Sequence, residues 1–139
     1  MNKKSKLIWF VLISIVVLLS GCAAPIPKFV IPPNFREIAL PIAENLISGM
    51  DKLDYAIFTR DFDEKMIKAL PTTAMTELRK LLWDQNGNYQ SINFKQVLEQ
   101  KGFIITIFSM VFEKGILDMQ LVFTAEPPYK ISGIWFPPK

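Results

Sequence analysis

The sequence predicts an α+β fold in which helices come first and a curved four-stranded antiparallel sheet follows. Apolar residues recur at helical spacing as far as Asn86, and from Ser91 onward the pattern changes to four strand-like runs. Only short turns separate these segments. Because short connections join antiparallel neighbours, the sheet is expected to be a meander.

The first predicted helix is centred near residue 45 and carries a stripe of apolar side chains. Pro41 is expected either to start or to kink this helix, and Gly49 to end it. The stripe consists of Ala39, Ile42, Ala43, Leu46 and Met50. Its spacing places these side chains on one face, which predicts that they enter the core.

Shorter helices are expected to follow. Tyr55, Phe58 and Phe62 repeat at helical spacing, and Asp63 is a candidate N-cap for a helix over residues 64–70. Pro71 ends that helix, and Thr72 or Thr73 is expected to cap the next. The last helix carries the stripe Met75, Leu78, Leu81 and Leu82 and ends near Asn86 and Gly87.

The strands are predicted over residues 91–99, 103–113, 116–125 and 129–136. The third alternates so that one face is buried. The second is apolar on both sides, with Ile105, Ile107 and Val111 on one side and Ile104, Phe108, Met110 and Phe112 on the other. Helices can cover one face. The other requires sheet curvature, a partner subunit or the preceding linker.

The N-terminus has the three parts of an export signal: basic residues, an apolar stretch over 7–19 and small residues. Leu19-Ser20-Gly21-Cys22 resembles a lipoprotein lipobox, which implies cleavage between Gly21 and Cys22 and acylation of the thiol. The expected organisation is a signal peptide over 1–21, a lipidated Pro-rich linker over 22–34 and one domain over 35–139. An uncleaved signal anchor is the alternative. Both place the domain at the outer face of the cell membrane.

The net charge of +3 comes from Lys3, Lys4 and Lys6, because the rest of the chain holds thirteen basic and thirteen acidic residues. A neutral domain gives no reason to expect a nucleic-acid partner. Cys22 is the only cysteine, so the domain cannot form an internal disulfide. Residues 29–31 are apolar and are expected either to pack on the domain or to rest in the membrane interface.

Four motifs resemble a small domain family of unknown function that occurs in exported lipoproteins and attached to α/β-hydrolases. They are Asp61-Phe62-Asp63-Glu64-Lys65-Met66, Ala69-Leu70-Pro71, Phe112-Glu113-Lys114-Gly115 and Lys130-Ile131-Ser132-Gly133-Ile134-Trp135-Phe136. The resemblance covers residues 42–136. It implies a cone-shaped α+β fold of the nuclear transport factor type, and it brings no catalytic residues to transfer.

The composition excludes several kinds of chemistry. Without histidine, Cys/His and Ser/His/Asp nucleophile systems are absent, and no metal site or cofactor is expected. Asp61, Asp63 and Glu64 form an acidic group that can serve as acid, base or cation ligand. Helix capping and a solvated first turn are the alternative interpretation.

Seven aromatic side chains are candidates for lining a pocket between helices and sheet, and core packing is the alternative. They are Tyr55, Phe58, Phe62, Trp83, Phe108, Phe112 and Trp135.

The leading functional hypothesis is a non-enzymatic lipoprotein that binds a small apolar ligand or an envelope protein. The second is an isomerase or dehydratase that uses Tyr55 or Tyr89 with Asp54, Asp61 or Asp118. The third is a homodimer formed through an exposed sheet face.

Overall fold

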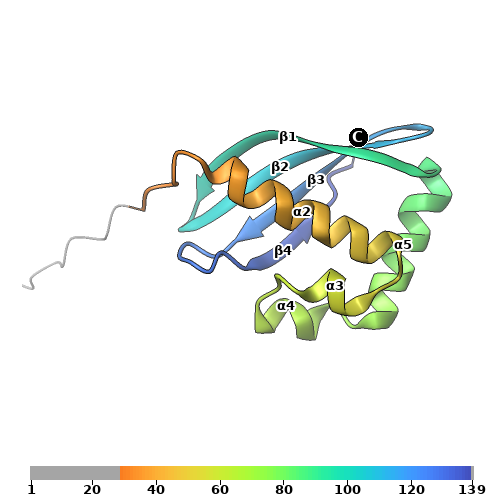
Figure 1. Ribbon diagram of the computed structural model, residues 1–139, viewed down its shortest axis with the longest axis horizontal. Coiled ribbons are helices and arrows are strands. Elements are labelled where there is room, and N and C mark those ends of the chain that lie inside the picture. Colours follow the sequence, from red (N-terminus) through yellow and green to blue (C-terminus); the bar gives the residue numbers. More distant parts are fainter. Residues whose placement is uncertain (1–28, 139) are drawn as a thin grey trace, which may run out of the picture.

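The computed structural model describes residues 29–138 and has the α+β arrangement that the sequence predicts (Figure 1). The predicted signal peptide and Cys22 lie outside these residues. The described elements are α2 (Phe35–Asp51), α3 (Tyr55–Thr59), α4 (Glu64–Ala69), α5 (Thr72–Asn86), β1 (Tyr89–Gln100), β2 (Phe103–Phe112), β3 (Gly115–Phe123) and β4 (Ile131–Trp135). The strands form one antiparallel sheet in the order β1-β2-β3-β4, which confirms the predicted meander. Within this range no helix is long and apolar enough to cross a bilayer.

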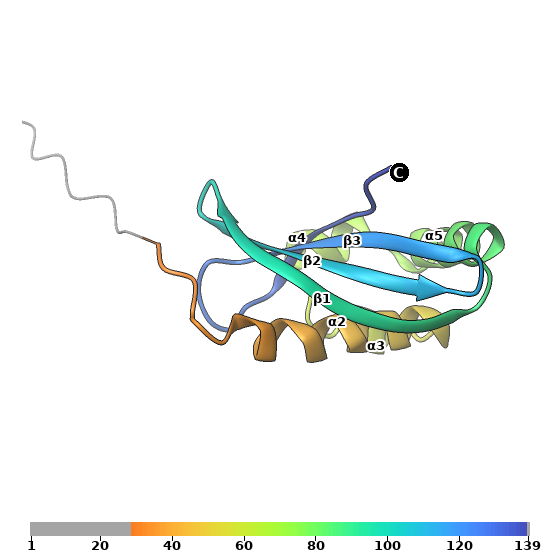
Figure 2. The same ribbon diagram turned by 90° about the horizontal axis from the view of Figure 1, so that it is seen from above.

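The core lies between α2 and one face of the sheet (Figures 1 and 2). Alternate residues of the two central strands are buried there, including Phe108 in β2 and Met119 in β3. The Phe35 ring of α2 meets the Phe123 ring edge-on, with centroids 5.4 Å apart. Such edge-to-face contacts add to the hydrophobic stabilisation of a core.

α2 begins earlier than the sequence indicates. Its first residue is Phe35, and Pro41 lies inside the helix rather than at its start. Proline has no N–H and therefore removes one i→i−4 hydrogen bond. Burial compensates for this loss, because apolar side chains are buried along most of the helix: Phe35, Ala39, Ala43, Leu46, Ile47 and Met50. Ile42 of the predicted stripe is only partly buried and packs against this core.

Gly49 does not end α2, which continues to Asp51. The backbone of α3 lies directly against it: a Cβ on Gly49 would lie 2.3 Å from the Phe58 nitrogen and 2.6 Å from its Cα. Backbone atoms cannot turn aside as a flexible side chain can. Glycine is therefore needed here for close packing and not as a helix terminator.

The short helices correct two further predictions. α3 ends at Thr59, so Phe62 lies outside it in the extended segment that follows. Asp63 caps α4 as predicted, since its carboxylate accepts a hydrogen bond from the Met66 N–H at 2.7 Å. Neither Thr72 nor Thr73 caps α5, because both lie inside the helix and Pro71 occupies the N-cap position without a side-chain hydrogen bond.

The second face of the sheet carries no helix in the part of the chain that the structure describes. We call it the open face. On β2 it holds Phe103, Ile105, Ile107, Ser109 and Val111, which alternate with the buried residues. Phe29 and Ile31 do not cover it, because they pack against the core on the helical side. The apolar residues before α2 therefore extend the domain.

Replacing Gly49 with alanine is expected to lower the free energy of unfolding by about 1–3 kcal/mol, because the new methyl group would overlap the α3 backbone. This loss exceeds the roughly 1 kcal/mol by which alanine normally favours a helix over glycine. Urea unfolding followed by circular dichroism measures the change. Ser48→Ala, one residue earlier in α2, is the control and should have little effect. A Gly49→Ala protein as stable as the native one would contradict the close packing.

Candidate functional site

The segment between α3 and α4 pairs with the outer edge of β4. Phe62 and Ile131 form a parallel bridge in which the Ile131 N–H donates to the Asp61 carbonyl at 2.8 Å. The Asp63 N–H donates in turn to the Ile131 carbonyl at 3.0 Å. Two of the quoted motifs therefore meet in space. The pairing covers the edge of β4 and fixes α4 and α5 beside the sheet.

Asp63 strengthens this junction. Its carboxylate caps α4 and also accepts a hydrogen bond from the Ser132 hydroxyl at 2.6 Å. The Ser132 hydroxyl, aided by the Met66 and Lys65 amides, holds the pKa of Asp63 below its usual value against the opposing effect of burial. Asp63 is thus an ionised structural group.

A second motif ties the β2–β3 turn to the end of α5. The Glu113 carboxylate accepts from the Asn88 N–H at 2.9 Å and from the Asn88 side-chain amide at 3.1 Å, and these bonds lower its pKa. The Lys114 N–H donates to the Asn86 carbonyl at 3.0 Å. Gly87 has φ +80°, a backbone conformation that favours glycine. A Cβ at this position would also lie against the Glu113 side chain.

β4 pairs with only part of β3. Its register runs from Gln120 to Phe123, and the chain then leaves the sheet at Phe136-Pro137-Pro138. Proline has no N–H to donate to a neighbouring strand, so β4 cannot continue along β3. Among the described residues, no strand pairs with this edge of β3 over residues 115–119. An unpaired strand edge therefore begins where β4 ends.

A hollow with apolar walls lies beside this edge. It consists of two adjoining depressions of about 430 and 330 Å³ that share Leu81, Leu82 and Phe136. The remaining lining residues are Leu70, Leu78, Gln85, Asn86, Leu117, Ile134, Trp135, Pro137 and Pro138. We call it the α5–β3 groove. Leu81 and Trp135 stay 53% and 59% exposed at its rim, so large apolar surfaces face solvent there.

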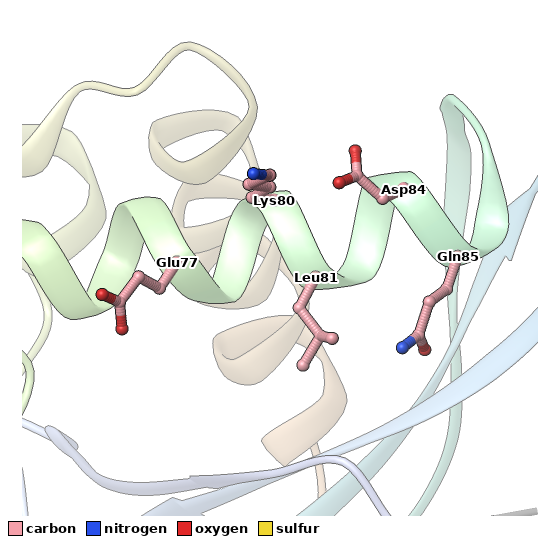
Figure 3. Close-up of a pocket in the computed structure, with 5 residues that line it drawn as sticks. All are labelled: Glu77, Lys80, Leu81, Asp84 and Gln85. Carbon is pink, nitrogen blue, oxygen red and sulfur yellow. The ribbon is translucent and has the colours of Figure 1, made fainter.

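A third depression of about 290 Å³ adjoins the groove along α5 (Figure 3). It is lined by α5 alone, through Glu77, Lys80, Leu81, Asp84 and Gln85. In Figure 3 Leu81 and Gln85 point from the helix toward the strands, whereas Asp84 points the other way. Leu81 thus joins the two hollows, and the charged side chains form a polar rim.

A family model described as "Protein of unknown function (DUF3887)" matches residues 43–133. The chain belongs to this family. The chain matches no curated protein and no solved structure. The matched range of the DUF3887 domain includes the Phe62–Ile131 pairing and the Glu113–Asn88 contact, and it ends two residues before Trp135.

The seven aromatic candidates separate into two groups in this DUF3887 domain. Phe58, Phe62, Phe108, Phe112 and Trp83 belong to the buried core. The Tyr55 hydroxyl donates to the Leu70 carbonyl at 2.9 Å, at the end of α4. Trp135 is the one of the seven that lines the α5–β3 groove.

The carboxylates proposed for an isomerase-like site have other partners. Asp54 caps α3 by accepting from the Ile57 N–H at 3.0 Å. Asp61 accepts from Arg60 at 2.7 Å and from the Asn45 amide at 3.4 Å, while Asp118 accepts from Lys95 at 2.7 Å. None of the three lines the groove.

The phenol of Tyr89 lies in the aromatic cluster between α5 and β2. Its ring packs against Trp83 and Phe112 with centroids 6.4 and 5.9 Å apart. Burial, followed by the charges of Glu44 and Asp51, raises its pKa, so the hydroxyl stays protonated at neutral pH. Within residues 29–138 no three acidic, cysteine or histidine side chains gather as metal ligands.

Ser132→Ala should lower the free energy of unfolding by about 1 kcal/mol at pH 7, because Asp63 loses a hydrogen bond to its charged form. Since the pKa of Asp63 is lowered in the folded state, this contribution is complete above the unfolded value of about 3.9 and disappears as pH falls through the folded value. Urea unfolding at pH 7 and below pH 3 measures the difference. Ser91→Ala, at an exposed strand position, is the control. An effect of Ser132→Ala that is equal at both pH values would contradict the charge-assisted bond.

Proposed function

We propose that this protein is a lipoprotein held at the outer face of the cell membrane by acyl chains on Cys22, and that its domain binds an extended apolar segment of a protein partner. The anchor is supported by the sequence around Leu19–Cys22. The binding role is supported by one observation, the apolar α5–β3 groove beside an unpaired strand edge.

An extended segment fits this surface because the groove offers both backbone and side-chain contacts. A strand placed along residues 115–119 of β3 would take the position that β4 leaves at Pro137. Its amides and carbonyls would bond to the strand edge, while alternate side chains would enter the groove near Leu81 and Leu117. A small apolar ligand in the same groove is the alternative.

The enzyme hypothesis gains less support from the geometry. Tyr55 donates its proton to a backbone carbonyl, and Asp54, Asp61 and Asp118 cap a helix or form ion pairs. A general acid or base must reach a bound substrate, and these groups lie outside the groove. The groove itself is mostly apolar, which suits binding.

Leu81→Asp is expected to weaken peptide binding at least about tenfold, because burying a leucine side chain contributes roughly 1.5–3 kcal/mol. Stability should change by less than about 0.5 kcal/mol, since Leu81 is exposed. The measurement is the affinity of peptides selected from a displayed library against residues 29–139. Ile67→Asp is the control, because Ile67 is an exposed apolar residue of a helix outside the groove.

The same peptides distinguish strand addition from simple apolar binding. Methylating the peptide nitrogens that face β3 should abolish binding, while methylating the alternate nitrogens should not. Peptides that bind equally well to the Leu81→Asp protein would contradict the proposal. An apolar dye that depends on Leu81, without any peptide that does, would favour the small-ligand alternative.

For the anchor, Cys22→Ser is expected to leave a precursor that still carries residues 1–21 and no acyl chain, because the thiol is the group that lipid modifies. Intact-mass spectrometry of the membrane fraction measures this directly. The native chain is the control and should begin at an acylated Cys22. Normal cleavage of the Cys22→Ser protein would contradict the lipoprotein assignment.

A further inference from the structure

One end of the open face carries an uninterrupted apolar row that crosses the sheet. The strand register places Leu98, Ile105, Val122 and Gly133 in one row across all four strands. Phe103 lies beside this row at the β1–β2 turn and is 44% exposed. This end of the open face therefore has no polar side chain in its first complete row.

Polar side chains occupy the middle of the face, between that row and the row of Ser91, Val111 and Ile116 at the far end. The next row contains Gln96, Ile107, Gln120 and Trp135, and the row after it contains Asn93, Ser109 and Asp118. The Lys95 ammonium reaches across β2 to the Asp118 carboxylate at 2.7 Å. An ion pair that spans the middle of the face keeps that region hydrated and separates the complete apolar row at the first end from Val111 and Ile116 at the other.

The described chain begins at this same apolar end. Figures 1 and 2 both show the segment before α2 next to the β1–β2 turn and the β3–β4 connection. Phe29 and Ile31 fix that segment to the core, while Val30 between them is 71% exposed. The segment that carries Val30 and the β1–β2 turn beside Phe103 thus lie at the same end of the domain as the Leu98 row.

The distance from the proposed anchor is short. Seven residue steps separate Cys22 from Phe29, and a fully extended chain covers at most about 3.6 Å per step, or roughly 25 Å. Acyl chains on Cys22 lie within the bilayer, so the end of the domain that carries Phe29 stays near its surface. The opposite end of β2 lies nine residue steps away, about 30 Å further along the strand at roughly 3.3 Å per step.

We infer that this end of the open face, with Val30, Phe103, Leu98, Ile105 and Val122, rests in the interface of the lipid bilayer. The inference depends on the proposed acylation of Cys22 for its proximity. The apolar side chains leave water there, which contributes about 25 cal/mol for each Å² buried. The β2–β3 turn and the α5–β3 groove stay in water, where a partner can reach them.

Two labelled variants of the full chain test the inference. Lys101→Cys lies in the β1–β2 turn and Lys114→Cys in the β2–β3 turn, both at exposed lysines. Because acylation consumes Cys22, the introduced cysteine is the only free thiol and carries a nitroxide. In native membranes the label at 101 should lose collisions with an aqueous nickel complex and keep those with oxygen. The label at 114 should keep both.

Matched substitutions examine the role of the apolar side chains. Phe103→Asp should return the label at 101 to water, whereas Ile116→Asp should not, although Ile116 is 54% exposed on the same face. Both residues are exposed, so neither change should unfold the domain. A label at 101 that is unaffected by Phe103→Asp would overturn the inference.

The remaining outcomes separate the inference from the anchor on which it depends. Acylated protein whose two labels collide equally with nickel overturns the inference and leaves the anchor intact. Loss of both nickel and oxygen collisions at 101 indicates a protein surface, such as a second copy, and also overturns it. Mass spectrometry of the same sample reports acylation, and an unmodified Cys22 overturns the anchor and the inference together.

Discussion

The pairing of residues 61–63 with Ile131 is the interaction on which the rest of the site depends. It joins two segments that lie about seventy residues apart, and it directs the chain so that α4 and α5 follow along the edge of β4. Asp63 reinforces the pairing by capping α4 and binding Ser132 with one carboxylate. Without this junction, Leu81 and Leu82 would have no fixed position relative to Phe136, and the groove would have only one wall.

Two prolines then determine how much of the β3 edge is left unpaired beside the groove. Pro137 and Pro138 cannot donate backbone hydrogen bonds, so β4 stops while β3 still has an unpaired edge. Unpaired edges attract other chains and are commonly covered. Here a hollow separates α5 from this edge, so the helix does not pack fully against it. The surface is thus restricted to ligands that fit between a helix and a strand.

The sequence was sufficient for features that depend on local chemistry. The Asp63 cap, the turn after Asn86 and the alternation in β3 each follow from neighbouring residues, and the structure confirms them. Gly49 was misinterpreted because its role depends on α3, which approaches from outside the helix. Local propensity leaves Pro41 either at a helix start or at a kink, and the structure places it inside α2, which begins at the buried Phe35.

The position of the groove is harder to predict from the sequence. Met75, Leu78, Leu81 and Leu82 form one predicted stripe, but only Met75 belongs to the core without lining the groove, and this division depends on where α5 meets β4. The paired prolines after the last strand were a usable signal, because they forbid continuation of the ladder. Aromatic content indicated a pocket at other residues, and most of those rings stabilise the core instead.

The attachment of Phe29 and Ile31 to the core also determines how far the domain reaches. With Cys22 acylated as proposed, these residues leave only seven residue steps between the anchor and Phe29, which keeps this end of the domain within about 25 Å of the bilayer surface. Confinement of this kind raises the effective concentration of the domain toward neighbours in the same membrane and lowers it toward distant ones. In the proposed lipoprotein, two apolar side chains before the first helix therefore limit how far from the membrane the groove can meet a partner.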